Sequence, residues 1–398
     1  MIQRALAKKL RQLATTFPVI TLTGPRQSGK TTLVQHVFPR HAYVSLEQPT
    51  HRRFALDDPR GFLAQFTRPV ILDEAQYAPD LFSYIQGIVD ARDQPGQFIL
   101  TGSQNFLLLQ RISQSLAGRC AILHLLPCSL AELSGRPPVS LKRLGREHAR
   151  HAVPPPRSLM ECLFMGGYPR IHDKHLDPRD WLASYYQTYL ERDVRNVLAV
   201  GDLEQFSRFV LLCAGRNGQL LNLSSLASDC GATHTTARRW LSVLEASFLI
   251  ALLRPYHRNF GKRLVKSPKL YFLDTGLLCY LLQIDTAQAL YQHAARGAIF
   301  EAFVLSELYK NFMNRGQRPW LYFWRDVAGH EVDFLIEQGT DLLPIEVKSS
   351  ETLSDESFRE LLNWRAISSH RGGPLALIYA GSETTLRKNV RVYPWFTL

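Results

Sequence analysis

No stretch of the sequence approaches the roughly 18 consecutive apolar residues that a membrane-spanning helix needs. The first 14 residues also lack the apolar core of a signal peptide, because Ile2, Leu6, Leu10 and Leu13 recur at helical spacing among basic residues. We therefore expect an amphipathic first helix, no membrane partner and a cytoplasmic location.

The six cysteines form no C-x-x-C pair, and no histidine pair has a spacing typical of zinc ligands. We therefore expect no zinc site and reduced thiols. Acidic residues are also scarce: 35 Asp and Glu accompany 47 Lys and Arg, for a formal net charge of +12. This balance favours a polyanionic partner, with nucleic acid as the first candidate, although a merely basic surface is the alternative.

The chain is organised around residues 24–32, which fit the phosphate-loop pattern G-x-x-x-x-G-K-[ST] at every fixed position. An apolar run at 18–23 predicts the strand before the loop, and 30–37 predicts the helix after it. Lys30 supplies a positive charge to the phosphates, and the Thr31 hydroxyl is expected to ligate Mg²⁺. The predicted nucleotide-binding residues of the loop are Gly24, Pro25, Arg26, Gln27, Ser28, Gly29, Lys30, Thr31 and Thr32.

Two adjacent carboxylates, Asp73 and Glu74, follow a second apolar run at 69–73. Further strands are expected at 42–46, 97–101 and 121–126, and their alternation with helical segments predicts a parallel sheet covered on both faces. Ligands of such sheets bind beyond the carboxyl ends of the strands. We expect Asp73 to hold Mg²⁺ and Glu74 to orient the attacking water as a base; two acidic residues that merely begin a loop are the alternative.

Polar residues after the strand at 97–101 are candidate sensors of the γ-phosphate, namely Thr101, Ser103 and Gln104, although the same residues are ordinary in turns. Arg119 is a candidate for stabilising charge on the transferred phosphate, within its own chain or in a neighbouring subunit. A surface arginine without such a role is the alternative.

Residues 216–272 have the pattern of a winged helix: a short helix, a turn, a second helix over about 233–248, and two strands joined by a basic segment. In the second helix, Ala237, Trp240, Leu241 and Leu244 are expected to face inward. A winged helix that contacts only protein is the alternative to DNA binding. The candidate nucleic-acid residues are His234, Arg238, Arg239, Arg258 and Arg263.

The last part of the chain contains a second set of charged residues. Asp333, Glu346 and Lys348 fit the D-x(n)-[DE]-x-K pattern of metal-dependent nucleases, and a helix that precedes them contains Glu301. Glu346 and Lys348 share one face of their strand because side chains alternate along it. The carboxylates are candidate Mg²⁺ ligands and Lys348 a candidate for charge stabilisation, although alternating charges are also common on exposed strands.

Several motifs together resemble the bacterial and archaeal AAA-type ATP-binding proteins with a carboxy-terminal domain of unknown function. They are residues 24–32, Leu72-Asp73-Glu74-Ala75-Gln76, Leu100-Thr101-Gly102-Ser103-Gln104, Ala117-Gly118-Arg119 and Tyr271-Phe272-Leu273-Asp274-Thr275-Gly276. The resemblance covers nearly the whole chain and implies ATP binding through Lys30, Thr31, Asp73 and Glu74.

The expected fold class is α/β: a RecA-like P-loop ATPase domain with a parallel sheet, a helical segment, a winged helix and a PD-(D/E)xK nuclease-like α/β domain. The expected bounds are 1–135 for the ATPase domain, 136–157 for a proline-rich basic linker or loop, 158–215 for the helical segment, 216–272 for the winged helix and 273–398 for the end domain.

The leading hypothesis is an ATPase that uses Mg²⁺ and couples its nucleotide state to DNA binding, with a homo-oligomer as one possible assembly. An ATP-gated, metal-dependent DNA nuclease is the second hypothesis. A signalling or scaffold ATPase whose C-terminal domains bind protein is the third.

Overall fold

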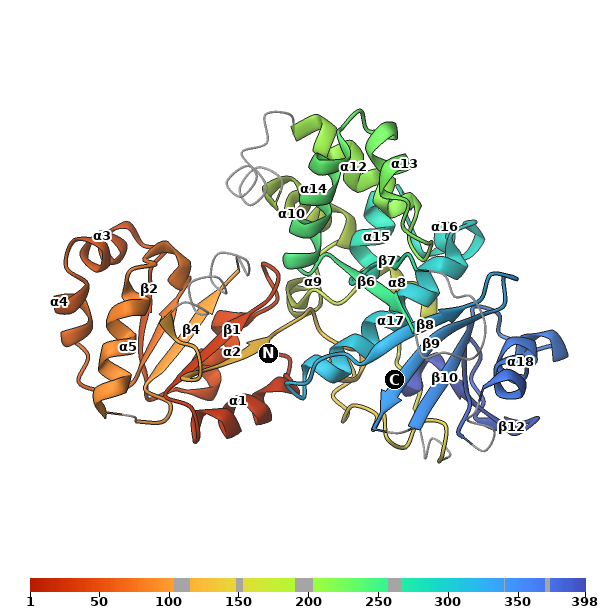
Figure 1. Cartoon of the computed structure of the whole chain (residues 1–398), viewed down its shortest axis with the longest axis horizontal. Helices are drawn as coiled ribbons and strands as arrows, with labels where there is room; N and C mark the ends of the chain where they lie inside the picture. Colours follow the sequence, from red (N-terminus) through yellow and green to blue (C-terminus); the bar gives the residue numbers. More distant parts are fainter. Residues whose placement is uncertain are drawn as a thin grey trace. The chain divides into compact units, whose positions relative to one another are not determined.

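The structure is a computed structural model that describes residues 1–92, 94–103, 115–147, 153–189, 203–256, 266–339, 341–368 and 373–398. The chain forms two compact units, coloured by position along the sequence in Figure 1. The first unit contains 1–128, 246–248 and 312–318, and the second contains 129–245, 249–311 and 319–398.

The first unit is built on a five-stranded parallel sheet in the order β2-β3-β4-β1-β5. The five strands predicted from the sequence are all present, within two residues of their expected bounds. Because all strands run the same way, their carboxyl ends share one edge of the sheet. The elements are α1 (Leu6–Ala14), β1 (Val19–Thr23), α2 (Lys30–Val37), β2 (Ala42–Ser45), α3 (Pro49–Asp57), α4 (Pro59–Ala64), β3 (Val70–Asp73), η1 (Ala75–Tyr77), α5 (Leu81–Arg92), β4 (Phe98–Gly102) and β5 (Cys120–His124).

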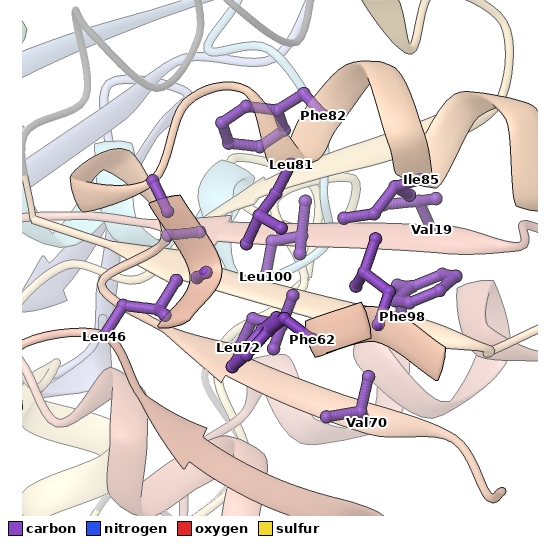
Figure 2. Packing of buried hydrophobic residues seen from close by; sticks show 14 of the residues in the cluster. Val19, Leu46, Phe62, Val70, Leu72, Leu81, Phe82, Ile85, Phe98 and Leu100 are labelled. Atoms are coloured by element: carbon purple, nitrogen blue, oxygen red, sulfur yellow. The ribbon is translucent and has the colours of Figure 1, made fainter. Parts of the chain in front are cut away.

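Helices cover both faces of this sheet, which explains why β1, β3 and β4 are buried along their whole length. Alternate residues of β4 point to opposite sides: Phe98 and Leu100 belong to one buried cluster and Ile99 to the other. Figure 2 shows the first cluster, in which strand residues pack with Phe62 of α4 and Phe82 of α5. The second cluster includes apolar residues of α1 and α2. The parallel, doubly covered sheet expected from the sequence is therefore confirmed.

The second unit contains an eight-stranded mixed sheet in the order β12-β13-β11-β10-β9-β8-β6-β7. β10 lies inside this sheet, antiparallel to β9 and parallel to β11. The elements are α7 (Leu130–Leu133), α8 (Leu159–Met165), α9 (Pro169–Lys174), α10 (Pro178–Tyr189), α12 (Leu203–Gly215), α13 (Leu223–Asp229), α14 (His234–Ala246), β6 (Ile250–Pro255), β7 (Lys269–Phe272), α15 (Thr275–Leu281), α16 (Ala287–Gln292), α17 (Arg296–Met313), β8 (Leu321–Arg325), β9 (Glu331–Gln338), β10 (Asp341–Lys348), η3 (Asp355–Phe358), α18 (Arg359–Ile367), β11 (Ala376–Tyr379), β12 (Thr385–Arg387), β13 (Val390–Pro394) and η4 (Trp395–Thr397).

The two helices and two strands predicted for 216–272 are present as α13, α14, β6 and β7. β6 and β7 pair with each other in antiparallel fashion, and Arg254 and Pro255 of β6 also pair with β8. The two strands therefore extend the larger sheet rather than forming a separate wing. The winged-helix assignment of this segment stays a prediction.

The proline-rich segment 136–157 has neither helix nor strand in its described residues, 136–147 and 153–157. It is nevertheless packed against other parts of the second unit, to which it belongs, and Leu141 and Leu144 are buried. The backbone N–H of Gly145 donates to the Tyr393 hydroxyl at 2.9 Å, and the Gln338 side chain donates to the Leu141 carbonyl at 2.7 Å. These contacts tie the segment to β9 and β13.

The motif at 271–276 closes a tight contact within the second unit. One carboxylate oxygen of Asp274 accepts from the N–H of Leu277 at 2.9 Å and caps α15, while the other accepts from the N–H of Gly167 at 2.7 Å. A Cβ at Gly276 would lie 2.8 Å from the carbonyl oxygen of Met165. Helix capping and close packing thus explain Asp274 and Gly276 of the motif.

Candidate functional site

The phosphate loop connects β1 to α2 at the carboxyl edge of the parallel sheet. Gly24 has a φ of 146°, and a Cβ there would lie 2.1 Å from the carbonyl oxygen of Leu125. Gly29, just before α2, has a φ of 91°. Both positions require glycine, because other side chains rarely adopt these angles and the first has no room for one.

Lys30 is buried at the start of α2. Its Nζ donates to the carbonyl oxygens of Gly24, at 3.0 Å, and Pro25, at 2.8 Å. The positive charge is therefore fixed against the loop whose backbone N–H groups would cradle a phosphate.

The Asp73 carboxylate at the end of β3 is surrounded by hydroxyl groups. The Thr31 hydroxyl lies 3.1 and 3.0 Å from its two oxygens, and the Tyr43 hydroxyl donates to Oδ2 at 2.9 Å. Thr101, at the end of the neighbouring strand β4, also donates to Asp73. Three segments of the chain thus meet at one carboxylate.

Glu74 has a left-handed backbone, with φ 56° and ψ 47°, which is uncommon for a residue other than glycine. Its Oε2 accepts from the Ser103 hydroxyl at 3.0 Å and from the Ser103 N–H at 3.3 Å. Burial by itself raises the pKa of Glu74, but the charge of Lys30 and hydrogen bonds from Gln76 and Ser103 outweigh it and lower the pKa. Glu74 is therefore ionised at neutral pH.

Two of the candidate sensors thus contact the acidic residues directly: Thr101 donates to Asp73, and Ser103 donates to Glu74. Gln104 lies outside the described residues. Arg119 is not brought to this site. It precedes β5 at the amino edge of the sheet, opposite the phosphate loop, and its guanidinium pairs with Asp90 of α5. A role for Arg119 toward phosphate would have to be played in a neighbouring subunit.

Three residues that the sequence interpretation did not assign also contact this region. The Arg4 guanidinium donates to the carbonyl oxygens of Ser28, at 2.7 Å, and Leu126, at 2.6 Å. Tyr43 reaches Asp73, and His124 Nδ1 lies 2.6 Å from the hydroxyl of Thr23, the residue before the loop. Each is distant in sequence from the motif it contacts and belongs to no motif of its own. Strand pairing brings Tyr43 and His124 to their partners, whereas Arg4 reaches the loop from the segment before α1.

Asp333, Glu346 and Lys348 lie together on the neighbouring strands β9 and β10 of the second unit. Asp333 Oδ2 accepts from the N–H of Val347 at 2.8 Å, and Lys348 Nζ donates to Glu346 Oε1 at 2.6 Å. Burial, and then the charges of Glu346 and Glu301, raise the pKa of Asp333 well above its ordinary value. Burial raises the pKa of Glu346 to about 7, although Lys348 opposes the rise.

Glu301 on α17 is engaged by two residues of β7 that the sequence interpretation did not assign. The Tyr271 hydroxyl donates to Glu301 Oε1, and Lys269 Nζ lies 3.3 Å from the same oxygen. Lys269 also pairs with Glu331. Among the described residues, no group of three or more His, Cys, Asp or Glu side chains is arranged to hold a metal ion.

The candidate DNA residues of α14, His234, Arg238 and Arg239, are exposed. Ala237, Trp240, Leu241 and Leu244 are buried, as expected for the inward face of that helix. Arg258 and Arg263 lie outside the described residues. Within the described ranges, no helix is long and apolar enough to cross a membrane.

Three family descriptions match successive parts of the chain. Residues 16–134 match an AAA domain, 156–288 match a domain of unknown function (DUF8612), and 296–398 match a second domain of unknown function (DUF4143). The AAA match contains the phosphate loop and both carboxylates of the first site. The protein is thus an AAA-type P-loop ATPase by family and fold.

Two mycobacterial relatives extend over almost the whole chain. The uncharacterized proteins Rv2008c of Mycobacterium tuberculosis and Mb2031c of Mycobacterium bovis are each 32% identical over 386 residues, which is 96% of this chain and 80% of theirs. The chain belongs to their family, the AAA-type ATPases with a C-terminal DUF4143 domain.

Solved structures are more distant. The Walker-type ATPase of Pyrococcus abyssi has a TM-score of 0.45 at 14% identity and covers 70% of this chain and 94% of its own. The RuvB Holliday junction branch migration motor of Thermotoga maritima has a TM-score of 0.31 at 18% identity and covers 63% of this chain and 90% of its own.

Proposed function

We propose that the first unit hydrolyses ATP with Mg²⁺. The observation that carries this proposal is the meeting of Lys30, Thr31, Asp73 and an ionised Glu74 at the carboxyl edge of one parallel sheet. Lys30 would contact the β- and γ-phosphates, and Thr31 and Asp73 have hydroxyl and carboxylate oxygens close enough to share one Mg²⁺. The ion, when bound, would neutralise charge that develops on the phosphates.

Glu74 would accept a proton from the attacking water. Its hydrogen bonds from Ser103 and its left-handed backbone fix the direction of the carboxylate, which supports a positioned base. Thr101 donates to Asp73 and lies 3.4 Å from the N–H of Glu74, so it connects the two acidic residues. Loss of the γ-phosphate would then affect Asp73 and Glu74 together, because Thr101 of β4 contacts both residues.

We further propose that the second unit couples this cycle to DNA. Support comes from the exposed basic residues of α14, Arg238 and Arg239 with His234, and from the formal net charge of +12. Phosphate contacts by such residues predict binding that weakens steeply as salt is raised.

The test is ATP hydrolysis measured without DNA and with single-stranded, duplex and branched DNA. Stimulation by one form, lost in Arg238→Ala/Arg239→Ala, is the expected result. Equal rates in all four conditions would contradict coupling to DNA while leaving ATP hydrolysis itself intact. The role of DNA and the hydrolysis of ATP are thus tested separately.

A metal-dependent nuclease is the second candidate function, because Asp333, Glu346 and Lys348 lie together as their sequence pattern requires. Its test is cleavage of linear and branched DNA with Mg²⁺ or Mn²⁺, with and without ATP. Cutting that disappears in Asp333→Ala would support it.

A further inference from the structure

Lys269 is a buried lysine in the middle of the carboxylates of the second unit. Its side chain, at the start of β7, is 5% exposed. Nζ lies 3.3 Å from Glu301 Oε1 and pairs with Glu331. A buried ammonium is stable only when its charge is matched, so Glu301 and Glu331 are its counter-ions.

Tyr271 strengthens this arrangement from the same strand. It is two residues beyond Lys269, so both side chains point to one face of β7. The Tyr271 hydroxyl donates to Glu301 Oε1, the oxygen that also faces Lys269. Glu301 is thus already engaged by an ammonium and a hydroxyl.

A divalent cation at this place would need oxygens that carry uncompensated charge. Lys269 pairs with Glu301 and Glu331, and Lys348 pairs with Glu346. The positive charges of both lysines also act on Asp333. Only Glu346 Oε2 is a buried carboxylate oxygen without a hydrogen bond in the part of the chain that is described.

We propose that Lys269 is a built-in cation of the second unit, which takes the place of a divalent metal among Glu301, Glu331 and Asp333. The wild-type protein therefore binds divalent metal weakly there, and this cluster does not cut DNA. A cluster compensated in this way argues against the metal-dependent nuclease considered above and has no bearing on ATP hydrolysis.

The test is Mn²⁺ binding by titration calorimetry without nucleotide, in wild type, Lys269→Met and the charge-preserving control Lys269→Arg. Lys269→Met should bind Mn²⁺ at least tenfold more tightly than wild type, and Lys269→Arg should match wild type. Adding Asp333→Asn to Lys269→Met should remove the gain. The first site contributes equally in every sample because Thr31 and Asp73 are unchanged.

Two results would overturn the proposal. One is tight Mn²⁺ binding by wild type that Asp333→Asn abolishes, and the other is a folded Lys269→Met variant with no gain. If Lys269→Met does not fold, the Mn²⁺ affinity of Glu301→Gln tests the proposal instead. This substitution should leave the wild-type Mn²⁺ affinity unchanged, since Glu301 serves Lys269 and Tyr271, whereas a tenfold loss would identify Glu301 as a metal ligand.

Discussion

Each unit contains a buried lysine near carboxylates, but the partners of the two lysines differ. In the first unit, Lys30 donates to backbone carbonyls of the phosphate loop, and its charge helps to lower the pKa of Glu74. In the second, Lys269 pairs directly with Glu301 and Glu331. Lys30 thus holds its charge against the loop that would bind a phosphate, whereas the charge of Lys269 is matched by two carboxylates in direct contact with it.

The carboxylates of the two clusters also differ, in the direction in which their pKa values are shifted. Glu74 has a lowered pKa and is ionised, which suits a base. Asp333 and Glu346 have raised pKa values, because burial and then neighbouring carboxylates disfavour their charged forms. We infer that the first cluster can accept a phosphate ligand, whereas in the second cluster the charges of the lysines and carboxylates already balance one another.

The largest expected effect separates the two lysines. Lys30→Ala should reduce ATP turnover by roughly 100-fold or more, since it removes a charge aimed at the transferred phosphate. Arg11→Ala on the exposed side of α1 is a control of equal charge change and should retain turnover. Near-normal ATP turnover by Lys30→Ala in a steady-state assay would contradict the role of Lys30 in phosphate binding, and with it the difference between the two lysines.

Arg4→Met should weaken ATP binding by roughly tenfold, because a charged donor to the loop carbonyl of Ser28 is lost. Nucleotide affinity, measured by fluorescence titration, is the readout, and Arg11→Ala again serves as the control. An unchanged affinity would mean that the loop keeps its shape without the contact from Arg4.

Glu346→Gln should stabilise the protein at pH 8. A carboxylate whose folded pKa is about 7, above its ordinary 4.5, contributes stability at low pH that is lost as pH rises through about 7. The neutral variant escapes this loss, by on the order of 1 kcal/mol in the free energy of unfolding. Urea unfolding at pH 5 and 8 measures it, with the exposed Glu351→Gln as control. A variant less stable than wild type at pH 8 would contradict the prediction.

His124 should give a pH response of the opposite sign in the first unit. Burial lowers its pKa from 6.5 to about 4, so its contribution to stability is present above about 6.5 and is lost as pH falls toward 4. His124→Asn should flatten that fall by at most about 1.4 kcal/mol per pH unit. Parallel unfolding curves for variant and wild type between pH 5 and 7 would rule this out.

The first site was largely predictable because its residues are local to their elements. The phosphate loop follows an apolar strand, and Asp73 and Glu74 end another, so a parallel sheet brings their ends together. The same rule shows why Arg119 is elsewhere. It comes before β5, not after it, and therefore lies at the opposite edge.

Long-range partners could not be read from the sequence. Arg4 and Tyr43 reach the first site from other elements, and Lys269 reaches Glu301 from a strand expected to belong to a separate winged helix. Pairing of β6 with β8 brings that strand into the larger sheet. Such contacts depend on strand order, which periodicity alone does not specify.

The most direct test of the central claim is Glu74→Gln, assayed for both ATP binding and ATP turnover. The variant keeps the size of the side chain and one accepting oxygen but removes the charge and the base. The account predicts ATP affinity within about threefold of wild type and turnover reduced by roughly 100-fold or more. Turnover equal to wild type would contradict it.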